Sequence, residues 1–94
     1  MFTKSEISTI DSQYFRVLGT SAFACSLQSM CTGHYWQIYS KETRVGAKHF
    51  VTCELYHRHD NRSEYHFQQR VPSLKEAIQV IQDHDAYVLR EHKV

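Results

Sequence analysis

The sequence predicts an α+β fold: a four-stranded antiparallel sheet made of two hairpins, covered on one face by a C-terminal helix and a short N-terminal helix. Two observations lead to this prediction. Apolar and polar residues alternate through the middle of the chain, as they do in strands with one buried face. Helical periodicity is confined to the two ends. At 94 residues we expect a single domain spanning residues 1–94.

A capping box marks the start of the first helix. Thr3 and Glu6 have the spacing at which a hydroxyl and a carboxylate satisfy each other's backbone N–H groups. Ile7 and Ile10, with Phe2 ahead of them, form the only apolar stripe of this helix. A helix this short is stable only when it docks on the rest of the domain.

The first hairpin joins strand-like runs at residues 23–28 and 35–39. A four-residue loop pairs Leu27 with Trp36 and gives both strands one shared apolar face. A slip by one residue would place the indole opposite a polar side chain, so this register is favoured. A further strand-like run, residues 14–18, precedes the hairpin.

The second hairpin spans residues 50–58 and 63–71. Of two registers one residue apart, the first places Leu55 opposite His66 and mixes polar with apolar groups. The second places Leu55 opposite Phe67 and produces a clean apolar face. We expect the second register, because cross-strand neighbours on a buried face are apolar together.

The remaining segments connect or close these hairpins. Residues 41–48 have little apolar content and are predicted to form an exposed, mobile loop. Pro72 ends the last strand, and a capping box at Ser73 opens a helix that is expected to end near His84. Residues 87–89 are apolar again, and we expect a short edge strand or an extended tail there.

One face of the predicted sheet is uncovered, and ring and cationic side chains gather on it. The buried face takes the rings of Phe23, Trp36 and Phe67. Candidate partner-binding residues on the uncovered face are Tyr35, Tyr39, Tyr56, Arg58, His66, Gln68 and Arg70. Tyr and Arg are enriched at the energetic centres of protein interfaces. We therefore interpret the chain as a protein-binding module that uses this face and the 41–48 loop, homodimerisation being its simplest form.

Nucleic acid is the alternative partner. Arg58, His66 and Arg70 combine a ring for base stacking with cations for phosphates, and the order helix, strands, helix resembles a double-stranded-RNA-binding domain in outline. However, 11 Lys+Arg against 10 Asp+Glu leave a net charge of +1, too little for a general attraction to polyanions.

The sequence also indicates where in the cell the protein is located. No apolar run approaches the roughly 18–20 residues that cross a bilayer, and the first residues lack the order of a signal peptide. We expect a cytoplasmic protein without a membrane partner. An odd count of 3 Cys also argues against a disulfide framework.

Three Cys and seven His raise the question of a metal site. The spacings Cys31 to His34 and Cys53 to His57 to His59 resemble a set of zinc ligands. On one strand Cys53 and His57 would lie about 13 Å apart, too far to share an ion. His57 and His59 would lie about 7 Å apart on one face and would need further ligands. We therefore expect no metal and no cofactor.

Catalysis is not expected either. The chain has no nucleophile elbow, no P-loop and no G-x-G-x-x-G fingerprint. His57, His59, Asp60 and Glu64 gather near one hairpin end, but Asp recurs at turns because it bonds to its own backbone. A chain this short rarely encloses a substrate pocket of about 300 Å³ or more.

Several short motifs carry a resemblance: Leu27-Gln28-Ser29, then Thr32 to Trp36, Tyr65-His66, and the helical pattern from Ser73 to Asp85. In these the chain resembles small proteins encoded by phages and integrative elements of gut Firmicutes, over roughly residues 14–88. The resemblance implies an inhibitor of host defence of the anti-CRISPR kind, with a nucleic-acid-processing defence effector as its partner. The balanced charge argues against mimicry of DNA and leaves steric blocking or locking of the target.

Overall fold

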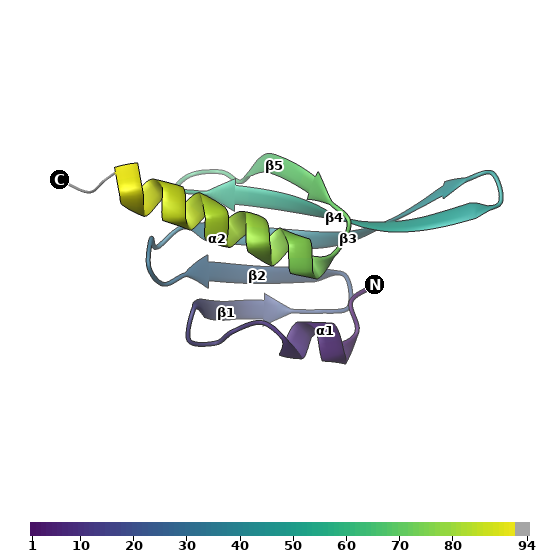
Figure 1. Cartoon of the computed structure of the whole chain (residues 1–94), viewed down its shortest axis with the longest axis horizontal. Coiled ribbons are helices and arrows are strands. Elements are labelled where there is room, and N and C mark those ends of the chain that lie inside the picture. The colour runs from purple at the N-terminus through teal and green to yellow at the C-terminus, as the bar shows by residue number, and fades with distance from the viewer. Residues whose placement is uncertain (92–94) are drawn as a thin grey trace.

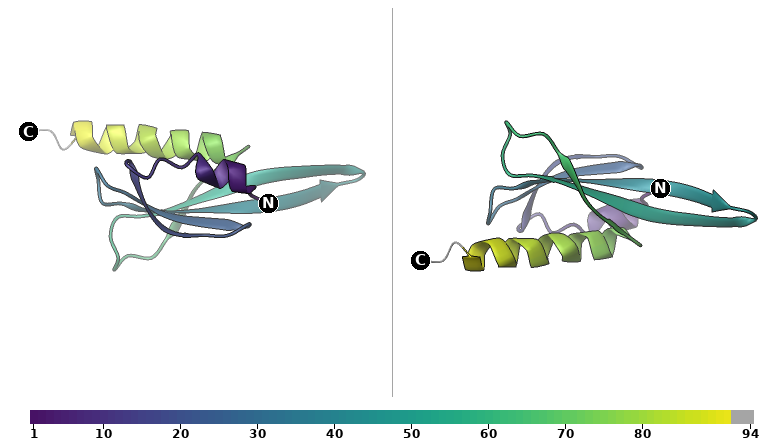
Figure 2. Two further views of the ribbon diagram at one scale, coloured as in Figure 1. Left: turned by 90° about the horizontal axis from the view of Figure 1, so that it is seen from below. Right: turned by 90° about the horizontal axis from the view of Figure 1, so that it is seen from above.

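The structure is a computed structural model that describes residues 1–91 as one antiparallel sheet with both helices on the same face (Figure 2). The elements are α1 (Lys4–Ser8), β1 (Phe15–Thr20), β2 (Ala24–Ser29), β3 (Tyr35–Val45), β4 (Lys48–Arg58), β5 (His66–Val71) and α2 (Leu74–Glu91). The strands lie side by side in chain order, from β1 to β5 (Figure 1). The predicted α+β class and the position of the helices are confirmed.

The sheet has five strands, so the prediction of four was wrong. The extra strand is β1, which includes most of the strand-like run at residues 14–18 and pairs with β2. Its first residue, Phe15, is 1% exposed and belongs to the core. β1 pairs with β2 on the side away from β3, a position that does not exist in a sheet made only of the two predicted hairpins.

The first hairpin has the predicted register. Leu27 lies opposite Trp36, and Cys25 lies opposite Ile38. All four side chains are completely buried, and together they form the centre of the core beneath α2. Matching the apolar faces of two neighbouring strands was sufficient here because no irregularity interrupts the pairing.

The second hairpin has a different register from the predicted one. A bulge lies between the pairs Leu55–Gln69 and Tyr56–Phe67, so the two strands lose step with each other. Phe67 therefore faces away from the core and is 53% exposed, which corrects its assignment to the buried face. Both registers considered from the sequence were uninterrupted ladders. Beyond a bulge, each side chain of the bulged strand lies on the opposite face of the sheet from where an uninterrupted ladder would place it.

Phe23 was also wrongly assigned to the core. Its ring is 59% exposed, and the residue stands in the turn just before β2 begins at Ala24. Its backbone still takes part in the sheet, because its carbonyl accepts a 2.8 Å hydrogen bond from the N–H of Ser40.

The predicted mobile loop at residues 41–48 is a strand pair instead. β3 runs to Val45, β4 starts at Lys48, and Gly46 turns the chain with a φ of 62°. We call residues 41–51 the β3–β4 arm; all of them are exposed. The arm projects from the sheet (Figure 1) and contributes to a longest dimension of 53 Å, against 23 Å across. Polar composition does not distinguish a loop from a ribbon that is solvated on both faces.

Helix α2 is longer than predicted. It does not end near His84 but continues to Glu91, so residues 87–89 are helical rather than a strand or an extended tail. No Gly or Pro follows His84 to stop the helix. Its buried stripe continues through Ile81 to Asp85, whose carboxylate is held by hydrogen bonds from other parts of the chain.

The short N-terminal helix forms as predicted. In the capping box, the backbone N–H of Glu6 donates to Thr3 Oγ1 and that of Thr3 donates to the Glu6 carboxylate, each at 3.0 Å. Phe2 and Ile10 at its two ends are buried in the core. Within residues 1–91, no helix is long and apolar enough to cross a membrane.

Candidate functional site

The face of the sheet away from the helices is the first candidate site, and we call it the open face (Figure 2). Strand alternation buries Trp36 and Ile38 of β3 and turns their neighbours outward, and β4 follows the same pattern. The side chains assigned to the open face are Tyr35, Gln37, Tyr39, Lys41, Glu54, Tyr56, Arg58, Tyr65, Phe67 and Arg70.

Arg58 organises one end of the open face. Its guanidinium carbon lies 4.7 Å from the ring centroid of Tyr35 and 4.4 Å from that of Tyr65. A guanidinium is attracted to the negative face of an aromatic ring and loses little hydration when it stacks there. The three side chains therefore hold one another in a defined arrangement before any partner binds.

A row of rings continues from this end across the face. Tyr39 and Tyr56 meet edge to face at 5.4 Å between ring centroids, and Tyr56 meets Phe67 at 5.6 Å. A shallow depression of about 340 Å³ lies among Gln37, Tyr39, Lys41, Glu54, Tyr56 and Tyr65. A partner that enters this depression would therefore meet both aromatic rings and polar side chains.

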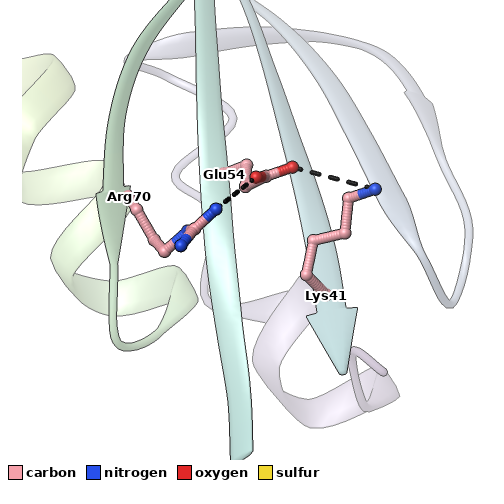
Figure 3. Close-up of polar contacts among 3 residues, drawn as sticks. All are labelled: Lys41, Glu54 and Arg70. Atoms are coloured by element: carbon pink, nitrogen blue, oxygen red, sulfur yellow. Dashed lines mark hydrogen bonds and ion pairs between the residues drawn. The ribbon is translucent and has the colours of Figure 1, made fainter. Parts of the chain in front are cut away.

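Glu54 is the carboxylate at the centre of the cations on this face. Arg70 Nη2 lies 3.0 Å from one of its oxygens, and Lys41 Nζ lies 3.8 Å from the other (Figure 3). The three side chains come from β4, β5 and β3 respectively. Two cations therefore flank this carboxylate, and Arg58 adds a third at one end of the face, so the open face carries an excess of positive charge.

The structure brings most of the predicted partner-binding residues together. Tyr35, Tyr39, Tyr56, Arg58 and Arg70 all lie on the open face. Gln68 occupies the bulge of β5. His66 was wrongly placed, because the bulge puts it opposite His57 with its ring on the helix side of the sheet. Sequence reasoning missed Tyr65 and Phe67, since only the bulged register turns Phe67 outward.

The second candidate site is a histidine cluster at the end of the sheet near the C-terminal half of α2. Of the six histidines within residues 1–91, five form it: His34, His57, His59, His66 and His84. They come from the β2–β3 turn, the end of β4, the start of β5 and the middle of α2. The cluster thus joins elements that are far apart in sequence. The end of β4 and the residues just after it contribute two of the imidazoles, and each of the other elements contributes one.

His57 is the centre of the histidine cluster and is 2% exposed. Its Nε2 lies 3.0 Å from His34 Nδ1, and its Nδ1 lies 3.4 Å from His66 Nε2. Its ring packs on the indole of Trp36 at 4.3 Å and against His84 at 4.7 Å. Both ring nitrogens of His57 therefore face other imidazoles.

Burial first, and then the neighbouring histidines, lower the pKa of His57 to about 3. The pKa of His84 is also lowered, mainly by burial, although Asp85 opposes this shift. His57 is therefore a neutral imidazole at neutral pH. In that form one ring nitrogen carries a lone pair that can accept a hydrogen bond or bind a metal.

The carboxylates near the cluster have other roles. Asp60 Oδ1 accepts hydrogen bonds from the backbone N–H groups of Arg62 and Ser63 at 2.9 and 2.8 Å, so this residue shapes the β4–β5 turn. Those backbone hydrogen bonds also lower its pKa. Asp85 accepts from Tyr14 and Thr32.

Comparison with family models, with curated proteins and with solved structures found no significant match for this chain. The two candidate sites therefore rest on their own geometry and chemistry.

Proposed function

We propose that the protein is a non-enzymatic binding module that recognises a protein partner through the open face. The observation that carries this proposal is Arg58 stacked between Tyr35 and Tyr65, next to the ring row of Tyr39, Tyr56 and Phe67. Tyr and Arg are enriched among the few residues that dominate binding energy in protein interfaces, and a pre-ordered set of side chains loses less entropy on binding.

The charge of the face indicates the chemistry of the partner. Lys41 and Arg70 flank Glu54, and Arg58 adds a further cation at one end of the face. The β3–β4 arm adds Arg44 and Lys48 against Glu42. We therefore expect a partner surface that combines apolar side chains with acidic ones, because complementary potentials speed association and suppress wrong partners.

The β3–β4 arm extends the contact surface beyond the sheet. Val45, Phe50 and Val51 are between 45% and 63% exposed there, so the arm presents apolar surface to a partner. A two-stranded ribbon is only marginally stable alone, and packing on a partner would order it. The resemblance to phage and integrative-element proteins makes a nucleic-acid-processing defence effector the first partner to test, with the module acting as an inhibitor that blocks it.

Nucleic acid is the less well supported partner. His66 lies on the helix side, Arg70 and Lys41 are directed at Glu54, and Arg58 lies between two rings. Phosphate binding would need such cations to be released from their present partners. Fluorescence anisotropy with duplex and single-stranded probes at two salt concentrations tests this alternative, because phosphate contacts weaken as salt rises.

The binding proposal is tested by affinity capture of defence effectors from a host lysate after nuclease treatment, with size-exclusion chromatography of the pure protein. Tyr56→Ala and Arg58→Ala should each weaken capture by roughly 30-fold, the effect of losing about 2 kcal/mol at a hot spot. Lys75→Ala on the exposed side of α2 is the matched control and should capture normally. Circular dichroism verifies that every variant folds. If both open-face variants capture the partner as well as the wild type does, the open face is not the binding surface.

A further inference from the structure

We infer that His34, His57 and His59 form a binding site for a divalent transition-metal ion of the Zn²⁺ class. Among the residues that the structure describes, one ring nitrogen from each of the three lies within 4.8 Å of the other two. This inference is independent of the open face, because the histidine cluster lies on the helix side of the sheet.

The distances are close to those that a metal ion needs. Zn²⁺ binds imidazole nitrogens at about 2.0–2.1 Å, so two ligand nitrogens of a tetrahedral site stand about 3.3 Å apart. His57 Nε2 and His34 Nδ1 are already 3.0 Å apart. His59 is exposed and follows the last residue of β4, so its ring can close the remaining distance by rotating about its side-chain bonds.

The chemistry of the ligand set selects the class of ion. Imidazole suits Zn²⁺, Ni²⁺ and Cu²⁺, whereas Mg²⁺ and Ca²⁺ require oxygen ligands. The nearby carboxylates are engaged elsewhere, Asp60 in the β4–β5 turn and Asp85 with Tyr14 and Thr32. Three histidines with access to solvent through His59 resemble the ligand sets in which water occupies a fourth position.

Two further contacts fit a metal site. His57 Nδ1 lies 3.4 Å from His66 Nε2, so a His57 that ligates through Nε2 can donate its remaining N–H to His66. Such a second hydrogen bond fixes the tautomer and orientation of most metal-binding histidines. His84 Nδ1, on a ring 4.7 Å from that of His57, is buried without a hydrogen-bond partner among residues 1–91, so the polar groups of the histidine cluster are not all satisfied by one another.

The third ligand, His34, comes from a part of the chain far from His57 and His59 in sequence. His57 and His59 lacked a partner when only their own strand was considered, and Cys53 was too distant. The β2–β3 turn supplies His34, because Tyr35 at the start of β3 pairs with Arg58 at the end of β4. That pairing places the residue before Tyr35 next to the residues at the end of β4.

The test is calorimetric titration of ZnCl2 into untagged protein that has been freed of metal with a chelator. We expect one ion per chain, a melting temperature that rises with Zn²⁺ concentration, and no binding of Mg²⁺. His59→Gln and His34→Gln should each weaken Zn²⁺ binding at least tenfold. His49→Gln, an exposed histidine on the β3–β4 arm beside Glu42, is the matched control and should bind like the wild type.

These variants keep the proposal falsifiable, since His59 is exposed and its replacement leaves the core intact. Circular dichroism checks the fold of each variant. Substitution with Co²⁺ provides a second readout, because a four-coordinate ion absorbs visible light far more strongly than the hydrated ion. The proposal is overturned if the folded protein takes up no stoichiometric Zn²⁺, or if His59→Gln and His34→Gln bind Zn²⁺ as tightly as His49→Gln does.

Discussion

The hydroxyl of Tyr14 donates a 2.7 Å hydrogen bond to Oδ2 of Asp85, which lies 71 residues further along the chain. Thr32 donates to the other oxygen of this carboxylate at 3.1 Å. Asp85 is 1% exposed, so these two hydroxyls replace the water that its carboxylate would otherwise bind. These two hydrogen bonds join the segment before β1, the β2–β3 turn and α2. Burial, and after it the hydrogen bond to Asp85, raise the pKa of Tyr14.

Replacing Tyr14 with Phe removes one donor from this buried carboxylate. We expect the free energy of unfolding to fall by about 1–3 kcal/mol, the cost of leaving a buried polar group unsatisfied. Chemical denaturation followed by circular dichroism measures it. Tyr87→Phe, at an exposed tyrosine on α2, should change stability by less than about 0.5 kcal/mol. Equal stability of the two variants would show that the Tyr14–Asp85 contact contributes nothing.

The bulged register of β4 and β5 predicts opposite results for two residues that the sequence placed together in the core. Leu55→Ala should destabilise the protein by about 2–5 kcal/mol, because Leu55 is completely buried. Phe67→Ala should cost less than about 1 kcal/mol, because its ring is mostly exposed. Urea denaturation of both variants tests this difference, and a Phe67 cost as large as that of Leu55 would favour the uninterrupted register instead.

Gly33 has a φ of 78°, a conformation in which a side chain is strained. A Cβ would meet no atom within 4 Å there, so the whole penalty of Gly33→Ala is conformational. We expect a loss of about 1–2 kcal/mol in the free energy of unfolding. Gly19→Ala is the matched control, with equally open surroundings and no positive φ, and it should be neutral or slightly stabilising. Thermal melts of both variants compare them, and an unperturbed Gly33→Ala would contradict the turn geometry.

The three cysteines should differ in reactivity. Cys25 and Cys53 are buried, and burial raises the pKa of both thiols, that of Cys53 to about 11. At pH 8 these thiols stay protonated, and only the thiolate reacts. Cys31 is exposed, so a thiol reagent should label one cysteine in the native protein and three after denaturation. Native Cys31→Ser should remain unlabelled, and rapid labelling of that variant would mean that the core opens easily.

Local patterns were a good guide where neighbouring residues decide the outcome. The capping box of α1 depends on two residues three positions apart, and the first hairpin depends on two adjacent strands with no irregularity. The bulge at Leu55 and Tyr56 could not be predicted in this way, because an uninterrupted ladder with Phe67 inside has equally good local chemistry. In the bulged ladder Val71 lies opposite Cys53, and both side chains are buried in the core.

The open face could largely be predicted from local patterns, whereas the histidine cluster could not. Alternation along β3 and β4 was enough to place Tyr35, Tyr39, Tyr56 and Arg58 on one face, although the stacking partner Tyr65 was missed. The histidine cluster was visible only in part, since the spacing of His57 and His59 contains no information about the β2–β3 turn. His34 joins them through strand pairing across 23 residues.

The class of fold, the antiparallel hairpins, the helix starts and the ring-rich face could be predicted, because each depends on periodicity or capping within a few residues. Packing between distant segments instead sets the fifth strand, the length of α2, the bulge of β5 and the meeting of His34, His57 and His59. Those features depend on which distant segments compete for the same core and the same backbone hydrogen bonds, a competition that spacing along the chain does not record.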